Sequence, residues 1–324
     1  ESLAIIHPNG RDGLLALFAA LYGGFRATMI NLAAGPDAIA FAMEHSGARY
    51  AFVHDSQCQV FAKAAPRGMV AILPEDLTSS APLPDLTAQD HALLMYTSGT
   101  TGRPKGVVHS HASLLAGGWT TAIAHELPPQ DRGFCVLPIY HINGLCVTVM
   151  GALVSGGSFA MVPRFSASRF WEQAAVAQIT WFSVVPTIIS HLLHGESVPG
   201  DAVRQHLRCA RSASSALAVE TQTAFEDRFG VPIIETMGLT ETAAQVLSNP
   251  LPPGTRKVGS PGVAYGNDVR ILTADLQEAP RNQEGEIAIR GPNVMREYLR
   301  NAEATAGTFA GERLRTGDLG RMDA

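Results

Sequence analysis

Hydroxyl, glycine and lysine side chains are concentrated in one stretch of the chain, residues 96–109 (YTSGTTGRPKGVVH). Glycines let backbone N–H groups converge on an anion without an obstructing Cβ atom. Serine and threonine hydroxyls add donors, and Lys105 adds a point charge suited to phosphate. These residue types favour binding of the outer phosphates of a nucleotide triphosphate, although a short glycine-rich string is also typical of an ordinary polar hairpin loop.

The stretch differs from the common P-loop, whose lysine directly follows the second glycine and opens a helix. In this chain two residues separate Gly102 from Lys105, and the apolar pair 107–108 behind them is typical of a strand. We therefore expect a loop that joins two strands, so that no helix dipole would lie beneath the phosphates.

Three later stretches put polar or small residues after an apolar run that is typical of a buried strand. These residues are His141, Ser214, Ser215, Thr240 and Glu241, which follow the runs 134–137, 207–212 and 232–235. In α/β folds ligands bind where such strands end. Each position also has an ordinary interpretation, because a single histidine is often structural, serines form tight turns, and a glutamate is often solvated near the start of a helix.

Residues 97–107 resemble the signature loop of the adenylate-forming superfamily, which contains acyl- and aryl-CoA synthetases, luciferases and the adenylation domains of nonribosomal peptide synthetases. Three further motifs of that superfamily have similar counterparts here, in the same order. They are Tyr140-His141, the stretch 236–242 (TMGLTET) and the stretch 315–318 (RTGD). The resemblance extends from Leu3 to Asp318. It implies an AMP-forming acyl-CoA synthetase, in which a carboxylate reacts with ATP and the acyl-adenylate then passes to CoA.

The resemblance also assigns roles to individual residues. Those expected to act in catalysis are Thr100, Lys105, His141, Thr240 and Glu241. Those expected to bind the nucleotide are Thr97, Ser98, Gly99, Thr101, Gly102, Ser214, Ser215, Thr236, Met237, Gly238 and Asp318. Among them the first loop would hold the outer phosphates, and Asp318 the ribose. Glu241 and Thr100 would bind Mg²⁺, a hard cation that prefers carboxylate and phosphate oxygens.

Two positions depart from the usual motifs of the superfamily. Met237 stands where a tyrosine is usual, so adenine stacking would become a softer contact with sulfur and aliphatic carbon. No acidic residue lies beside His141, which counts against an α-amino acid substrate. Residues 211–217 and 251–257 look most like the oxalyl-CoA synthetase branch, but Ala244 replaces the histidine that is usual there.

The sequence therefore leaves two classes of substrate acid as alternatives. One is a small dicarboxylate, which the likeness to the oxalyl-CoA branch favours and the missing histidine weakens. The other is a hydrophobic or aromatic acid, for which Trp181 and Phe182 would form walls of the pocket.

The composition excludes several other classes of protein. The chain has 324 residues, of which 46% are hydrophobic and 16% charged, as is typical of globular proteins. A net charge of −5 counts against nucleic acid or an anionic membrane as a partner. Glycine and serine interrupt the longest apolar stretch, residues 144–162, so we expect no membrane span. The four cysteines form no CxxC pair, and we expect them to be buried in a reducing, cytoplasmic compartment.

Strand and helix patterns alternate along most of the chain, which favours an α/β fold of layered, doubly wound sheets with helices. Short strands after Pro250, including residues 295–299, predict a small β-barrel-like subdomain. We expect an α/β adenylation core over residues 1–250 and a β-rich subdomain over residues 251–324. An apolar strand pattern at the first residues indicates a truncated start, and we expect the superfamily's C-terminal domain, with its lysine, to be absent from this chain.

The implied cofactors and partners are ATP, Mg²⁺, CoA and a small carboxylic acid, with a carrier protein as the alternative acceptor. We expect this chain by itself to bind ATP, to form the adenylate slowly and to make no thioester. A luciferase-like oxygenase and a non-catalytic nucleotide-binding module are the remaining alternatives.

Overall fold

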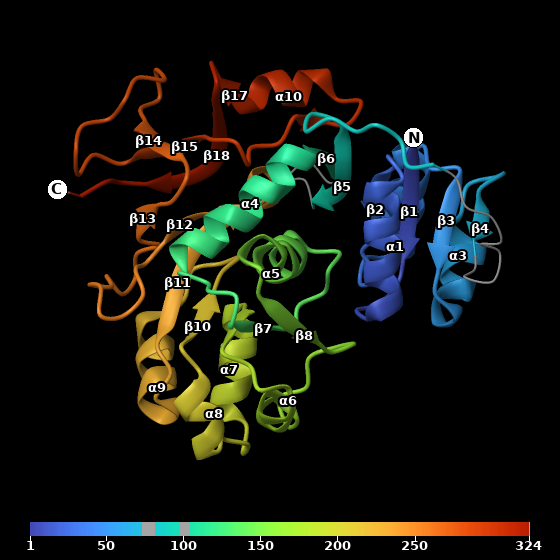
Figure 1. Ribbon diagram of the computed structural model, residues 1–324. Coiled ribbons are helices and arrows are strands. Elements are labelled where there is room, and N and C mark those ends of the chain that lie inside the picture. Colours follow the sequence, from blue (N-terminus) through green and yellow to red (C-terminus); the bar gives the residue numbers. More distant parts are fainter. Residues whose placement is uncertain (73–81, 98–103, 324) are drawn as a thin grey trace.

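A computed structural model describes residues 1–72, 82–97 and 104–323 of the chain. The described residues form two seven-stranded sheets and one four-stranded sheet, with helices packed around and between them (Figure 1). This arrangement confirms the predicted α/β fold with a smaller β-rich part near the C-terminus.

The first sheet has the strand order β16-β6-β5-β2-β1-β3-β4. Its strands are β1 (Ser2–Ile6), β2 (Arg26–Met29), β3 (Tyr50–Val53), β4 (Val70–Ile72), β5 (His91–Thr97), β6 (Lys105–Ser110) and β16 (Glu297–Tyr298). The helical segments before β5 are α1 (Arg11–Tyr22), α2 (Pro36–Ser46), η1 (Asp55–Gln57) and α3 (Cys58–Ala64). Strands β1 to β5 run parallel, and every residue of β1 is buried, as expected of a strand covered on both faces. Strand β6 returns antiparallel to β5.

The second sheet has the strand order β13-β12-β11-β10-β9-β7-β8. Its strands are β7 (Arg132–Cys135), β8 (Ser158–Met161), β9 (Trp181–Val184), β10 (Cys209–Ser212), β11 (Ile233–Leu239), β12 (Ala244–Ser248) and β13 (Val263–Ala264). The helical segments in this part are α4 (His111–Ala124), the π-helix η3 (Asn143–Met150), α5 (Gly151–Ser155), α6 (Phe170–Ala177), α7 (Pro186–His194), α8 (Asp201–His206), α9 (Val219–Phe229) and η4 (Thr240–Thr242).

Helix α4 packs against both large sheets and begins at a capping box formed by Ser110 and Ser113. Two glycines, Gly117 and Gly118, reduce the intrinsic helix propensity at its centre. The structure gives the reason for the first of them. A Cβ atom on Gly117 would lie 2.3 Å from the carbonyl oxygen of Ala243, so only glycine allows the helix to approach the residue before β12 this closely.

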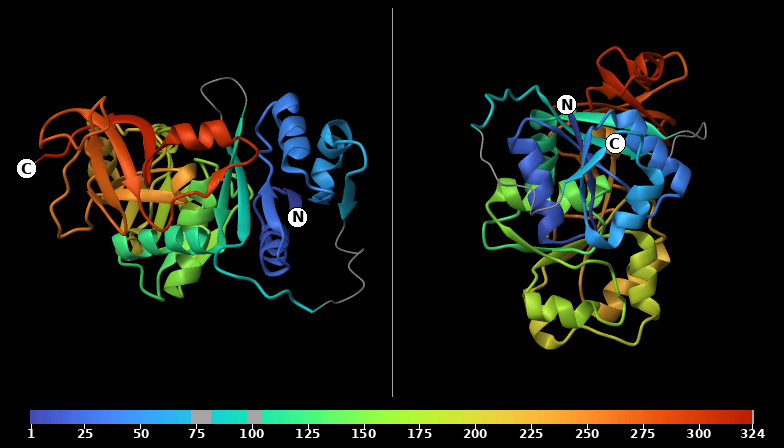
Figure 2. Two further views of the ribbon diagram at one scale, coloured as in Figure 1. Left: turned by 90° about the horizontal axis from the view of Figure 1, so that it is seen from above. Right: turned by 90° about the vertical axis from the view of Figure 1, so that its right-hand side faces the viewer.

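The third sheet is antiparallel and has the order β14-β15-β18-β17. Its strands are β14 (Asp268–Leu272), β15 (Gly285–Arg290), β17 (Phe309–Ala310) and β18 (Arg313–Gly320), and α10 (Ala302–Thr308) precedes β17. Figure 2 shows this sheet at the opposite end of the molecule from β1 to β4, with β5 and β6 between them.

Two sequence predictions are wrong. The strand predicted within residues 295–299 does not join the small sheet, because β16 pairs antiparallel with β6, with Tyr298 opposite Val107. Its partner is fixed by buried packing against Val107, which no local pattern reveals. Cys58 is exposed on α3, whereas the other three cysteines are buried.

The division into residues 1–250 and 251–324 stays a prediction. Among the described residues, no helix combines the length and apolar character needed to cross a bilayer.

Candidate active site

A cavity of about 760 Å³ lies between the second sheet and the small C-terminal sheet. Six of the residues predicted to bind nucleotide line it: Ser214, Ser215, Thr236, Met237, Gly238 and Asp318. They come from the turn after β10, from β11 and from β18, three segments that are distant in the sequence. The structure thus brings the second half of the predicted site around one space.

The turn after β10 is formed by small residues in an unusual backbone conformation. Ser214 has a φ of 75°, which is strained for a residue other than glycine. Its hydroxyl accepts a hydrogen bond from Nδ2 of Asn143 at 3.4 Å. Thr236 on the neighbouring strand donates to the carbonyl of Ser212 at 3.1 Å. These contacts hold the turn open at the rim of the cavity, where Ser214 and Ser215 are exposed.

Strand β11 is longer than its sequence predicts, because it continues through residues 236–239 before η4 begins. The register between β11 and β12 shifts at Met237 and Gly238. A Cβ atom on Gly238 would lie 1.7 Å from the carbonyl oxygen of Ala244, so this bulge accepts only glycine. Met237 packs against the apolar cluster around Leu247 and also lines the cavity.

Lys105, at the end of the predicted phosphate loop, and Glu241 both contact the side chain of Tyr298. The ammonium of Lys105 lies 4.8 Å from the centre of the Tyr298 ring. The Tyr298 hydroxyl donates to Oε1 of Glu241 at 2.8 Å, and burial together with this carboxylate raises the pKa of Tyr298. The backbone N–H of Met295 donates to the carbonyl of Glu241 at 2.7 Å. Lys105 and Glu241 therefore lie on the same side of the molecule, joined by a tyrosine.

A buried histidine connects the same two motifs through the backbone. Nε2 of His109 on β6 lies 2.7 Å from the carbonyl oxygen of Thr240, and Nδ1 lies 3.1 Å from the hydroxyl of Ser113. A carbonyl only accepts, so Nε2 carries a proton. Burial lowers the pKa of His109 to about 4. This contact fixes Thr240 relative to the strand that follows the predicted phosphate loop.

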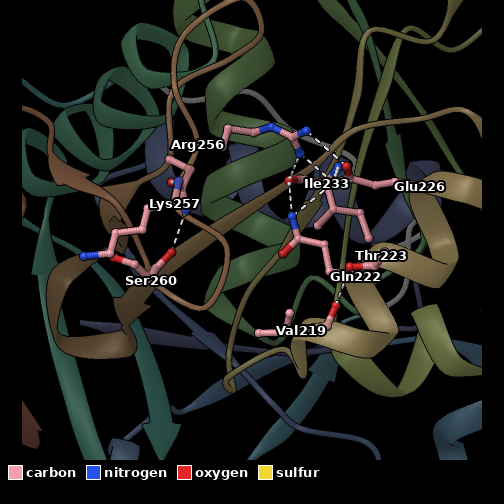
Figure 3. A network of polar contacts seen from close by, with 9 residues as sticks. Val219, Gln222, Thr223, Glu226, Ile233, Arg256, Lys257 and Ser260 are labelled. Carbon is pink, nitrogen blue, oxygen red and sulfur yellow. Dashed lines mark hydrogen bonds and ion pairs between the residues drawn. The ribbon is translucent and has the colours of Figure 1, made fainter.

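An ion pair joins Glu226 on α9 to Arg256 in the loop between β12 and β13, as Figure 3 shows. Arg256 donates to Oε1 and Oε2 of Glu226, at 2.5 and 3.0 Å, and to the carbonyl of Ile233. Burial alone would raise the pKa of Glu226, but hydrogen bonds from Arg256, Ile233 and Gln222 hold it below its usual value. The network anchors the segment that carries Lys257, which lines the cavity.

The remaining predicted residues fall into three groups. Thr97 and Lys105 face each other in the β5–β6 ladder, which confirms the strands predicted on either side of the phosphate loop. Residues 98–102, with Ser98, Gly99, Thr100, Thr101 and Gly102, lie outside the described residues. His141 is not among the described residues that line the cavity; its ring lies 5.0 Å from that of Tyr140, and desolvation lowers its pKa.

Sequence reasoning missed three residues of this region, namely Tyr298, His109 and Glu235. Glu235 lines the cavity, and its Oε1 accepts from the N–H of Leu217 at 3.2 Å. Its Oε2 is buried with no hydrogen-bond partner in the described part of the chain. A carboxylate at the end of an otherwise apolar strand is a signal that could have identified Glu235.

The AMP-binding enzyme family model matches residues 1–299. The chain belongs to the AMP-binding enzyme family. It is 41% identical to a sulfoacetate–CoA ligase from Cupriavidus necator, over all of this chain and 66% of that protein. It is 36% identical to an oxalate–CoA ligase from Saccharomyces cerevisiae, over 73% of this chain and 43% of that protein. This AMP-binding enzyme therefore spans less than two thirds of either relative.

Solved structures agree with this assignment. The ATP-bound crystal structure of MatB from Rhodopseudomonas palustris matches with a TM-score of 0.90 and 28% identity, over 100% of this chain and 66% of that chain. The N-terminal domain of FACL13 from Mycobacterium tuberculosis matches with a TM-score of 0.89 over 84% of that chain. At 24% identity, the second likeness concerns the fold alone.

Proposed function

We propose that this AMP-binding enzyme joins a carboxylic acid to ATP, giving an acyl-adenylate and pyrophosphate, and that CoA then displaces AMP. The observation that carries the proposal is the convergence of Ser214, Thr236, Met237 and Asp318 on one cavity. The cavity has the size and the mixed polar and apolar lining that suit a nucleoside.

In this proposal the adenine lies between Met237 and the turn at Ser214 and Ser215. The exposed Asp318 accepts hydrogen bonds from the ribose hydroxyls, since a carboxylate is a strong acceptor. The buried and unpartnered Oε2 of Glu235 is an acceptor that an amino group of the base would satisfy.

Lys105 and the loop that precedes it would hold the β- and γ-phosphates, and Thr240 would donate to the α-phosphate. The carboxylate of Glu241 would bind a Mg²⁺ ion through Oε2, because Tyr298 donates only to Oε1 and no other described residue is hydrogen-bonded to this carboxylate. When bound, Mg²⁺ would neutralise part of the phosphate charge. The protein residues contribute by orienting the carboxylate of the acid toward the α-phosphorus and by stabilising charge there.

The acid is proposed to be small. The two relatives named above act on sulfoacetate and oxalate, which both carry a second acidic group. Trp181 and Phe182, expected as walls for an aromatic acid, are 1% and 0% exposed and pack inside the apolar cores. We further propose that residues 1–250 form an adenylation core and that residues 251–324 form a β-rich subdomain. CoA is the proposed acceptor, as in the relatives' names.

The test is ATP–pyrophosphate exchange with a panel of carboxylic acids. The proposal predicts that one or a few acids drive exchange, slowly with this chain and faster with a version extended to the full length of its relatives, and that CoA added with that acid yields a thioester in the extended version. Exchange with thiolation of a carrier protein but not of CoA would favour an adenylation domain. ATP binding without exchange for any acid would reduce the protein to a nucleotide-binding module and contradict the proposal.

A further inference from the structure

Arg211 on β10 is a fully buried cation without an anionic partner in the described part of the chain. It is 1% exposed, and none of the ion pairs formed by the described residues includes it. Burial lowers the pKa of Arg211 to about 9, so the guanidinium still carries its charge at neutral pH. A buried charge is costly unless an opposite charge compensates it, which makes this position unusual for a purely structural residue.

The guanidinium is held by neutral acceptors on three elements. Its Nε donates to Oε1 of Gln245 at 2.8 Å, and its Nη1 lies 3.0 Å from Oδ1 of Asn143 and 2.9 Å from the hydroxyl of Ser183. Gln245 Oε1 also accepts from Nε2 of His125 at 2.9 Å. The Nη2 group has no acceptor among the described residues. The planar fork of arginine therefore keeps two N–H groups for another partner.

The same contacts orient the side chain of Asn143 toward Ser214, although Asn143 and Arg211 are not themselves among the described residues that line the cavity. Its Oδ1 accepts from both Arg211 and Ser183, at 3.0 and 2.8 Å. The amide nitrogen, Nδ2, therefore points away from Arg211 and Ser183. That donor end, Nδ2, reaches the hydroxyl of Ser214, which lines the cavity. The acceptor atoms of this cluster are thus already hydrogen-bonded within it. The N–H groups of Asn143 Nδ2 and Arg211 Nη2, and the positive charge of Arg211, lie behind the Ser214 turn.

We propose that Arg211, with Asn143 in front of it, selects acids that carry a second oxyanion, a carboxylate or a sulfonate, beside the carboxylate that is activated. The proposal rests on the proposed function and names its substrate class. The second oxyanion supplies the charge that Arg211 lacks, and the fork of Nη2 and the Asn143 amide bind its oxygens. The competing interpretation is that Arg211 only ties β10 to η3 and β12.

The experiment measures kcat/KM for pyrophosphate exchange with malonate and sulfoacetate, and with propanoate as the acid that lacks the second oxyanion. In Arg211→Met the preference for the doubly charged acids should fall by about tenfold or more, mainly through KM, since pairs with a charged group are strong. Exchange with propanoate should change little, and Arg211→Lys should restore part of the preference. Comparing malonate with sulfoacetate identifies which oxyanion is preferred.

Arg208→Met is the matched control, because Arg208 directly precedes β10 but pairs with Asp131. It should affect all three acids equally. Equal losses with all three acids in Arg211→Met would assign Arg211 a structural role only and overturn the proposal. Asn143→Asp, which replaces the donor by an anion of the same shape, should weaken the doubly charged acids selectively, and it provides a second test if Arg211→Met does not fold.

Equilibrium binding distinguishes a failure of the proposed adenylation activity from a failure of the proposed oxyanion site. Calorimetry with malonate and propanoate, in the presence of a non-hydrolysable ATP analogue, tests the oxyanion site without any reaction. Selective binding of malonate by the natural protein and its loss in Asn143→Asp would support the site even if no exchange occurs. If the natural protein binds and exchanges propanoate as well as malonate, the adenylation proposal stands and the oxyanion site is refuted.

Discussion

The hydroxyl of Tyr298 donates to Oε1 of Glu241 at 2.8 Å, although the two residues are 57 positions apart. The same ring lies under the ammonium of Lys105. The contact exists because β16 adds to the edge of the first sheet beside β6. One tyrosine thus orients the residue proposed to bind Mg²⁺ and touches the residue proposed to bind the outer phosphates.

Replacing this tyrosine tests its positioning role. In Tyr298→Phe we expect kcat/KM for pyrophosphate exchange to fall by about tenfold, because a hydrogen bond to a charged group contributes about 1.5–3 kcal/mol. The Mg²⁺ concentration for half-maximal rate should rise as well, which a loss of packing alone would not produce. Tyr50→Phe, at an exposed tyrosine on β3, is the control. An unchanged Mg²⁺ dependence would argue against the role.

The proposed ribose contact is tested at Asp318. Asp318→Asn should raise the Kd for ATP by about tenfold, because a charged acceptor forms hydrogen bonds roughly twice as strong as a neutral one. The variant should bind 2′,3′-dideoxy-ATP as well as the natural protein does, since that nucleotide lacks both hydroxyls. Asp275→Asn, in the exposed turn after β14, should change neither Kd. Equal weakening for both nucleotides would remove Asp318 from the ribose site.

Two glycines give opposite expectations for stability. Gly238→Ala should lower the free energy of unfolding by about 3 kcal/mol or more, because its Cβ would overlap the backbone of Ala244. Gly307→Ala on α10 has open space around its Cβ, so it should raise the free energy of unfolding by about 0.5–1 kcal/mol. Urea unfolding of both variants measures the difference. A Gly238→Ala protein of natural stability would refute the close approach of β11 and β12.

The buried histidines predict how stability depends on pH. His109 has a pKa of about 4 in the folded protein and 6.5 when exposed, so the unfolded chain binds its proton more readily. The free energy of unfolding is therefore highest above pH 6.5 and decreases toward pH 4, by about 1.4 kcal/mol per pH unit for each such histidine. His125, lowered to about 3, acts in the same direction.

His109→Gln isolates this contribution, because the glutamine amide can still donate to the carbonyl of Thr240. The decrease in stability between pH 6.5 and pH 4 should become less steep by about one proton. His206→Gln, at an exposed position on α8, should leave the slope unchanged. The measurement is urea unfolding at several pH values, and an unaltered slope in His109→Gln would contradict a neutral, buried His109.

Local patterns predicted the parts of the fold that depend on neighbouring residues. The apolar runs on both sides of the glycine-rich stretch indicated β5 and β6, and the pairing of Thr97 with Lys105 confirms that arrangement. There the signal lies within a few positions of the sequence, where strand alternation and turn residues determine the backbone. The set of residues that the cavity brings together was predicted by the resemblance to the adenylate-forming superfamily and not by a local pattern.

Contacts between distant segments could not be predicted in this way. The bonds from His109 to Thr240 and from Tyr298 to Glu241 depend on how the sheets pack, and no spacing in the sequence indicates them. Arg211 was noticed only as part of a motif, because a single arginine in a strand is normally interpreted as solvated. Its complete burial is a property of the packed sheets and helix layer.

The central claim is that the acid passes through an adenylate, and an isotope experiment tests it directly. A substrate acid labelled with ¹⁸O in its carboxylate is incubated with ATP, CoA and the protein extended to the full length of its relatives. When CoA attacks the carbonyl carbon, the bond between that carbon and the bridging oxygen breaks, and the oxygen stays on phosphorus. We predict one ¹⁸O atom in each AMP released, measured by mass spectrometry. Unlabelled AMP beside a newly formed thioester, or ADP as the product, would contradict the account.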